Sequence, residues 1–163
     1  MIKKISLILF ALISISAAGY LFWLRTHNQI WNVSSIDSVT LYSVDGYASG
    51  KADFEPQENQ EMFHGVPVLG KIQLDNDQQS EVINAMNKGI ADGNSVAACF
   101  WPRHAVRIEN DGVLTDYLIC FHCYQIKRFA DGSSDTISST RSPKIVFNKV
   151  LSDAGIELAP ESN

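Results

Sequence analysis

The three cysteines of this chain flank one short turn sequence, and that arrangement constrains the fold more than any other feature. Cys99 lies in an alternating apolar run, residues 96–109, while Cys120 and Cys123 lie in a second such run, residues 113–129. The tripeptide Asn-Asp-Gly separates the two runs. Because Asp-Gly between alternating runs is a strong signal for a β-hairpin, the sequence predicts two long paired strands that bring the thiols together.

The loop length of this hairpin decides which residues face one another. A three-residue loop places Cys99 directly opposite Cys123, whereas a two-residue loop places Cys99 opposite Tyr124. Directly opposed residues lie about 4.5–5.5 Å apart at Cα, which is within the range that a disulfide can join. Pro102 has no N–H to donate to the ladder, so the sequence predicts a bulge or a sheet edge beside the cluster.

Side-chain alternation along a strand separates the two neighbouring cysteines. Cys120 and Cys123 are three residues apart, so a regular strand points their thiols to opposite faces. This argues against a metal-binding knuckle, which needs a turn, and against a thioredoxin-type pair, which stands at the start of a helix. With the three-residue loop, one face carries His104, Cys120 and His122, and the other carries Cys99, Trp101, Arg103 and Cys123.

The N-terminus carries a long uncharged segment. Residues 5–24 contain no charged side chain, follow Lys3 and Lys4, and end before Arg25. A helix of this length reaches about 30 Å, enough to cross the hydrocarbon core of a bilayer. The basic tail in front of the segment predicts that the N-terminus stays in the cytoplasm.

Two interpretations of residues 1–25 stay open. One is a transmembrane anchor, and the other is a signal peptide cleaved after Ala18, behind small residues. The apolar run continues past that site through Leu21 to Leu24, which favours the anchor. Both interpretations deliver the rest of the chain to the periplasm or to the outside of a bacterial cell.

The remaining part of the chain, residues 26–163, has the size of one domain with its own core. Removing Lys3, Lys4 and Arg25 from the 13 basic residues leaves 10 against 18 acidic residues, a net charge of −8. An acidic surface repels phosphate backbones, so nucleic acid is excluded as an expected partner.

Four further segments predict the elements around the hairpin. Residues 38–44 and 66–74 are alternating and β-branched, as is typical of strands. Asp75, with Gln78 three residues later, forms a capping-box pattern at the start of a helix that ends near Gly93. A second helix is predicted from a serine cap and a proline at 142–143 up to Gly155, burying Ile145, Val146, Val150 and Leu151, with Phe147 as a further candidate.

The predicted fold is therefore α+β. The elements follow in the order β-β-α-β-β-α, with a candidate edge strand at residues 136–140. They form a small antiparallel sheet with two helices packed on one face, preceded by the N-terminal transmembrane helix or signal peptide.

The cysteine cluster has a structural interpretation, which we favour at this point. An exported domain folds where disulfides persist, and a Cys99–Cys123 bridge would close a loop of about 25 residues and stabilise the fold by roughly 3 kcal/mol. The remaining thiol, Cys120, would then be a small buried apolar group.

Two chemical interpretations compete with it. Cys99, His104, Cys120 and Cys123, with His122 as a substitute ligand, supply the right types for a tetrahedral zinc site or a thiolate copper(I) site. A cysteine near an imidazole and near Arg103 would also be a reactive nucleophile, although no recognisable catalytic set accompanies it.

Arg103 and His104 directly follow Pro102 and stand beside the thiol cluster. They fit either a solvated polar edge or a contact to an anion such as a carboxylate, because arginine presents a planar fork of donors. His64, which precedes Gly65, is interpreted as a loop residue.

The segments CFWPRH (99–104) and ICFHC (119–123) together resemble a bacterial family of uncharacterised exported or membrane-anchored proteins. Its members carry a C-F-x-P-R-H segment followed by an I-C-F-x-C segment, and the similarity extends from about His64 to Leu158. His122 departs from the acidic residue expected between the two cysteines. The resemblance implies an exported protein whose shared feature is this cluster, and it implies no activity.

These observations predict a membrane-anchored extracytoplasmic binding or accessory domain, held through residues 5–24, with Arg103 and His104 at a disulfide-stapled site. The alternative is a metal-binding or thiol-dependent protein that uses zinc or copper. Whether the chain is an enzyme stays open.

Overall fold

The computed structural model describes residues 36–160, so the predictions for the N-terminal segment lie outside the described residues. Within this range, no helix combines the length and apolar character that a bilayer span requires. The strands are β1 (Ser38–Val44), β2 (Met62–Phe63), β3 (Val66–Gln73), β4 (His104–Asn110), β5 (Val113–Cys120), β6 (Gln125–Ala130) and β7 (Ser133–Ser138). The helices are α2 (Asn76–Ala91) and α3 (Pro143–Asp153), and a short 3₁₀ turn, η2, covers Ala48–Gly50.

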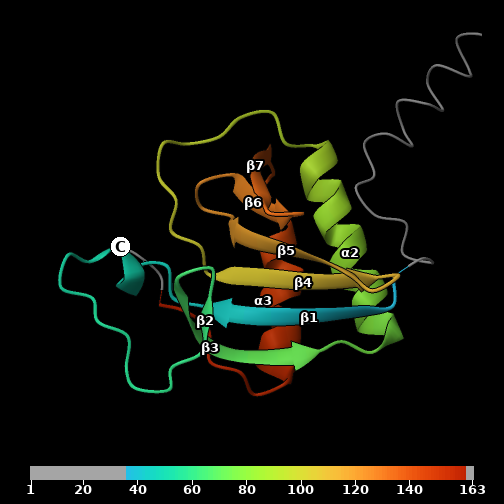
Figure 1. The fold of residues 1–163 in the computed structure, drawn as a ribbon. Coiled ribbons are helices and arrows are strands. Elements are labelled where there is room, and N and C mark those ends of the chain that lie inside the picture. The colour runs from blue at the N-terminus through green and yellow to red at the C-terminus, as the bar shows by residue number, and fades with distance from the viewer. Residues whose placement is uncertain (1–35, 161–163) are drawn as a thin grey trace, which may run out of the picture. The chain divides into compact units, whose positions relative to one another are not determined.

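The strands form one antiparallel sheet in the order β2-β3-β1-β4-β5-β6-β7 (Figure 1). The α+β class with two helices is therefore confirmed for the described residues. The predicted element order is wrong in detail, because the described sheet contains β2 and because residues 113–129 form two strands instead of one.

Both helices cover the same face of the sheet, and the main core lies between them and the strands (Figure 1). Alternate residues of the central strands point into this core, as a sheet with one covered face requires. Its fully buried members include Val39, Leu41, Val82, Ile83, Met86, Val106, Ile119, Ile126, Phe147 and Leu151.

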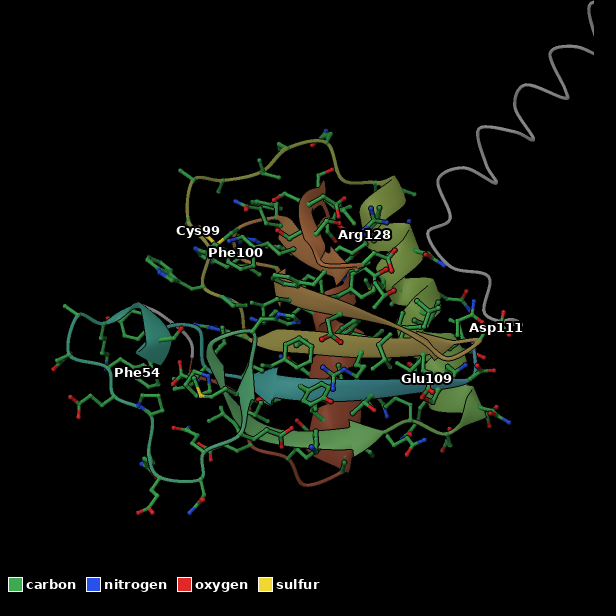
Figure 2. All side chains as sticks on the ribbon, in the orientation of Figure 1. Phe54, Cys99, Phe100, Glu109, Asp111 and Arg128 are labelled. Carbon is green, nitrogen blue, oxygen red and sulfur yellow. A yellow bond between two sulfur atoms is a disulfide. The ribbon has the colours of Figure 1, made fainter. Side chains whose placement is uncertain are left out.

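The opposite face of the sheet carries a second, smaller apolar cluster. Its buried residues are Tyr42, Val44, Phe63, Val66, Ala105 and Leu118, and Val68, Phe100 and Phe129 pack against it. The all-side-chain view in Figure 2 places Phe100 beside Cys99, on the loop that leads from α2 to β4. Side chains on one face of the sheet therefore meet the helices and the main core, and those on the other face meet this smaller cluster.

Helix α2 begins as the capping-box pattern predicts. The side chain of Asp75 accepts from the backbone N–H of Gln78 at 2.8 Å, and the Gln78 side chain accepts from the N–H of Asp75 at 3.2 Å. These two bonds satisfy donors that the first turn of a helix otherwise leaves unpaired. The helix ends at Ala91, slightly before the predicted stop at Gly93.

Helix α3 buries Val150 and Leu151 as predicted, but it exposes Ile145. Pro143 occupies the first turn, as predicted, but the Ser142 side chain makes no capping hydrogen bond. Ile145 is 77% exposed, whereas Phe147 is fully buried and takes the central core position. The helix is rotated so that its largest side chain fills the space over the sheet, which maximises buried apolar area.

The hairpin β4–β5 closes with a two-residue loop. Asn110 pairs with Val113, and both loop residues, Asp111 and Gly112, have positive φ values of 51° and 75°. Positive φ at both positions is the geometry of a type I′ turn, whose twist matches that of the flanking strands. This selects the shorter of the two loops that the sequence left open and shifts the pairing by one residue.

The predicted second long strand is interrupted after Cys120. Residues 121–124 form a turn in which the N–H of Cys123 donates to the carbonyl of Cys120 at 3.1 Å, and Tyr124 has a φ of 57°. The chain then reverses into β6, so that Cys120 pairs with Gln125. The turn contains none of the glycine, asparagine or proline residues that mark turns in sequences, which is why alternation alone predicted a continuous strand.

The predicted first long strand is also shorter than expected. Strand β4 starts at His104, and residues 92–103 run irregularly from α2 to the sheet. Pro102 lies just outside the strand, and its carbonyl accepts from the N–H of Gly46 at 2.8 Å. A Cβ atom at Gly46 would lie 2.3 Å from Pro102, so only glycine permits this approach.

Candidate functional site

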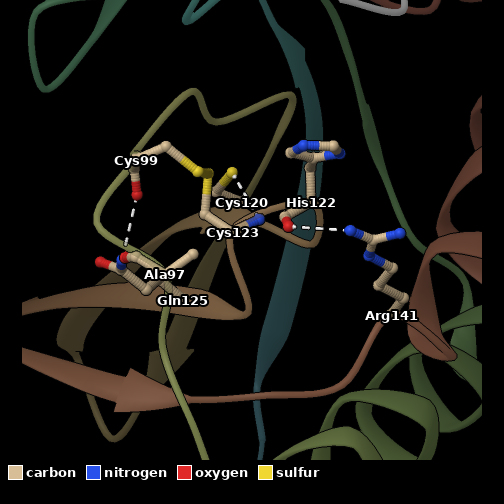
Figure 3. The surroundings of a disulfide bond; sticks show 7 residues. All are labelled: Ala97, Cys99, Cys120, His122, Cys123, Gln125 and Arg141. Atoms are coloured by element: carbon tan, nitrogen blue, oxygen red, sulfur yellow. Dashed lines mark hydrogen bonds between the residues drawn. A yellow bond between two sulfur atoms is a disulfide. The ribbon is translucent and has the colours of Figure 1, made fainter.

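A disulfide joins Cys99 to Cys123, with their Cα atoms 5.7 Å apart. The segment before Cys99 is held to the turn by further bonds, which Figure 3 displays. The N–H of Ala97 donates to the carbonyl of Cys123 at 2.9 Å. The Gln125 side-chain amide donates to the carbonyls of Ala97 and Cys99. The disulfide therefore ties an irregular segment to the β5–β6 turn.

The path to this bridge differs from the predicted one. In the observed register an extended β4 would place Cys99 opposite Tyr124, yet Cys99 lies outside the strand and Cys123 lies in the turn. The predicted pair of cysteines is brought together, but by the turn and the irregular segment instead of direct cross-strand pairing.

Cys120 is the remaining cysteine and is buried, with 1% of its surface exposed. Its sulfur accepts a hydrogen bond of 3.2 Å from the backbone N–H of Cys123. Burial raises the pKa of this thiol, and it outweighs the lowering by neighbouring backbone groups and by the positive charge of Arg103. At neutral pH Cys120 is therefore a protonated, buried thiol.

His104 and Cys120 do not share a face of the sheet, contrary to the alternation derived for a three-residue loop. His104 contacts α3, where its Nε2 is 2.7 Å from Asn148 Oδ1 and its ring meets Phe147 edge-on. Cys120 follows Leu118 on the face away from the helices. Among residues 36–160, no group of three His, Cys, Asp or Glu side chains is arranged to hold a metal ion.

A cavity of about 110 Å³ lies at this end of the sheet. Its walls combine aromatic and basic side chains from three parts of the chain: Trp101, Arg103, His104, Phe121, His122, Arg141 and Lys144. The predicted pair Arg103 and His104 thus lies in one cavity with His122, which was a candidate ligand, and with Arg141 and Lys144, which were not predicted from the sequence. None of these lining residues, all within the described range, is acidic.

Backbone hydrogen bonds fix the place of Arg103 in the sheet. Its N–H donates to the carbonyl of Ile119 at 3.1 Å, and its own carbonyl accepts from the N–H of Val44 at 3.1 Å. Arg103 is therefore bonded on both sides to neighbouring strands, although β4 formally begins one residue later. A side chain carried by such a backbone presents its charge in a defined place.

Arg141 and Lys144 stand at the N-terminal end of α3, where the helix dipole is positive. The first turn contains no acidic residue that would balance it. Arg141 is steered by a 3.3 Å bond to the carbonyl of His122 (Figure 3) and by the Tyr124 ring, 4.8 Å away. Two basic residues at a helix N-terminus are electrostatically unfavourable unless an anion balances them. Their position before and within the first turn of the predicted helix is therefore the sequence signal that could have identified them.

A second cluster lies on the face away from the helices. Asp116 accepts two bonds of 2.7 Å from Arg107 and lies 2.8 Å from His64 Nε2. The His64 ring stacks on Phe129 with centroids 3.8 Å apart, beside an open hollow of about 360 Å³. His64 is in the β2–β3 loop, as predicted, but it is tied across the sheet to residues far along the chain.

We expect Asp116→Asn to lower the free energy of unfolding by about 2 kcal/mol at pH 7, because it weakens charge-assisted bonds to a side chain that is only 11% exposed. Burial raises the pKa of Asp116, but the bonds from Arg107 and His64 outweigh it and hold the pKa below its usual value. The stabilisation is thus present above the unfolded pKa of about 3.9 and is lost as pH falls through the folded value.

Urea denaturation at pH 7 and near pH 2 checks this expectation. The gap between wild type and Asp116→Asn should close at the lower pH. Asp135→Asn is the matched control, since its pair with Arg128 is exposed and such pairs contribute about 0 to 1 kcal/mol. An equal gap at both pH values would contradict the assigned role.

Comparison with protein families, with curated proteins and with solved structures finds no match to this chain. The resemblance carried by the two cysteine segments therefore stays a prediction, and the interpretation of the site rests on its own geometry.

Proposed function

We propose that this chain is a membrane-anchored extracytoplasmic binding or accessory domain that holds a small anionic group in the cavity beside its disulfide. One observation carries the proposal: a cavity whose lining includes two arginines, a lysine and two histidines, and no carboxylate, in a protein of net charge −5. Concentrating cations in one concave place on an acidic protein costs electrostatic energy, which an anion bound there would offset.

The chemistry of the lining favours a carboxylate or a phosphate. Arg103 and Arg141 each present a planar fork of donors that matches the oxygens of such groups. The N-terminal end of α3, which carries Arg141 and Lys144, adds the positive end of the helix dipole. A volume of about 110 Å³ suits one such group of a larger molecule.

The aromatic residues at the cavity indicate what kind of group the anion is attached to. Trp101 is 41% exposed at the cavity, and its ring contacts the Tyr47 ring edge-on at 6.1 Å. Exposed Trp and Tyr side chains offer rigid, amphipathic contact area to a ligand. An anion attached to an apolar or ring-containing body fits this combination better than a free inorganic ion.

The proposed location rests on two features of the chain. The uncharged residues 5–24 behind Lys3 and Lys4 are typical of an anchor or of a signal cleaved after Ala18. The Cys99–Cys123 bridge suits the oxidising conditions outside the cytoplasm. The net negative charge argues against a nucleic acid partner.

Calorimetric titration of the purified full-length chain with phosphate, with benzoate and with acetate tests the proposal. We expect saturable binding of one anion per chain, with benzoate favoured over acetate. Arg103→Gln and Arg141→Gln should each weaken binding about tenfold or more, because each removes a charge-assisted contact worth about 1.5–3 kcal/mol.

Arg128→Gln is the matched control, because Arg128 lies on β6, is paired with Asp135, and lines no part of the cavity. It should bind as wild type does. Equal weakening by all three substitutions would mean unspecific attraction to surface charge, and the absence of saturable binding would overturn the proposal.

The sulfur cluster supports a second candidate function, the binding of zinc or copper(I) by the reduced chain. Residues 121–124 form the turn that a knuckle requires, and the N–H of Cys123 points to the Cys120 sulfur. Cys99, Cys120 and Cys123 would be the ligands, with His122 as the nearest imidazole in sequence. Native mass spectrometry of the reduced protein should show one bound ion that Cys120→Ser releases, and this candidate fails if reduced protein binds none.

A further inference from the structure

Cys123 lies within bonding reach of two other cysteines. Its Cα is 5.7 Å from that of Cys99, to which it is bonded. Cys120 stands three residues before it in a hydrogen-bonded turn, and such turns hold their end Cα atoms less than about 7 Å apart. Both separations are ones that a disulfide can join. Figure 3 shows the Cys120 sulfur pointing toward the existing bridge.

Burial disfavours the charged form of the Cys120 sulfur, and two neighbouring groups partly offset this effect. The backbone N–H of Cys123 donates to that sulfur at 3.2 Å, and Arg103 adds a positive charge. These groups stabilise the fraction of thiolate that forms, which is the species that attacks a disulfide. A purely space-filling cysteine needs no such donor.

The three sulfurs also differ in exposure. Cys120 and Cys123 are buried, with 1% and 0% of their surface exposed. Cys99 is partly exposed and lies in the irregular segment of residues 92–103. Whichever cysteine is left unbonded therefore decides whether the free thiol faces the interior or the solvent.

We propose that Cys99, Cys120 and Cys123 form a thiol–disulfide exchange site that delivers a reactive thiol at Cys99. The Cys120 thiolate attacks the sulfur of Cys123, the Cys120–Cys123 bond forms, the Cys99–Cys123 bond breaks, and Cys99 leaves as the thiolate. The proton lost by Cys120 is taken up by water or by Cys99, and no net oxidation occurs. The exchange does not presuppose the proposed anion binding.

The exchange gives Cys99 a chemistry that the bridged form lacks. As a surface thiolate it reacts with electrophiles, or with a disulfide R–S–S–R to form Cys99–S–S–R and release R–S⁻. It also frees the segment that carries Trp101 and Arg103 from its covalent tie to the turn.

The experiment labels the folded full-length chain with N-ethylmaleimide at pH 8 without reductant. Acid quenching, denaturation, reduction and labelling with iodoacetamide then mark the cysteines that were bridged. We expect one maleimide per chain on Cys99 and iodoacetamide on Cys120 and Cys123. Maleimide on Cys120, or no maleimide after a day on protein that circular dichroism shows to be folded, would overturn the proposal.

Two variants separate exchange from other sources of labelling. Cys120→Ser lacks the attacking thiol and should leave Cys99 unlabelled, so labelling equal to wild type would count against exchange. Cys99→Ser should oxidise to a Cys120–Cys123 bridge with no free thiol, whereas two persistent free thiols would show that the second bridge cannot form. Neither labelling readout measures anion binding, so the exchange can fail while the proposed function holds, and the reverse is also true.

Discussion

Phe147→Ala should lower the free energy of unfolding by about 3 to 5 kcal/mol, the largest effect that we expect from a single substitution in the core. The Phe147 side chain is fully buried between α3 and the sheet. Its ring meets the Phe121 ring edge-on at 5.2 Å and the His104 ring at 5.7 Å. Truncation removes these contacts and leaves a cavity that the rigid sheet cannot close.

Urea denaturation followed by circular dichroism measures this effect. Ile145→Ala is the matched control on the same helix, because Ile145 is 77% exposed and should change stability by less than about 0.5 kcal/mol. Since Phe147 also packs against His104 and Phe121, the variant should bind anions more weakly while still folded. A loss below about 1 kcal/mol would contradict the central position assigned to Phe147.

Cys123→Ser should lower the free energy of unfolding by about 3 kcal/mol, because it removes a bridge between residues separated by 24 positions in the chain. It also removes both disulfides that the proposed exchange uses. Denaturation of wild type with and without dithiothreitol should show a loss of similar size.

Cys120→Ser is the control for this loss. It keeps the Cys99–Cys123 bridge, and a serine oxygen can accept the hydrogen bond from the Cys123 N–H. An equal loss of stability in Cys120→Ser and Cys123→Ser would show that buried sulfur, and not the bridge, supplies the stability. Because the bridge holds the segment with Trp101 and Arg103, Cys123→Ser should also weaken binding in the basic cavity.

The hydrogen bonds that join near neighbours were predictable from the sequence. Strand β1 has the limits that its alternation predicts, and α2 starts at the Asp75 capping box. The β4–β5 hairpin turns at Asp111-Gly112, because these residues accept positive φ at little cost. In each case, the interaction that determines the element joins residues only a few positions apart in the chain.

The turn at residues 121–124 could not be predicted in this way. Phe121, His122, Cys123 and Tyr124 are not turn formers, and Tyr124 takes a positive φ that its side chain disfavours. The turn is held from outside, by the bridge to Cys99, by the bond from Ala97 and by the bond from the N–H of Ser139 to the carbonyl of Tyr124. The cysteine pair was therefore predicted correctly, but from direct cross-strand pairing, whereas the structure joins the two cysteines through this turn.

By itself, the sequence determined the α+β class, the capped helix, the hairpin and the presence of Arg103 and His104 beside a thiol cluster. Only the tertiary structure decided that Arg141 and Lys144 complete the basic cavity, that His64 meets Asp116 from 52 positions away, and that His104 and Cys120 lie on opposite faces. The physical reason is the range of the forces involved. Local hydrogen bonds and side-chain periodicity act between neighbours in the chain, whereas the cavity arises where the packing of α3 on the sheet brings distant charges together.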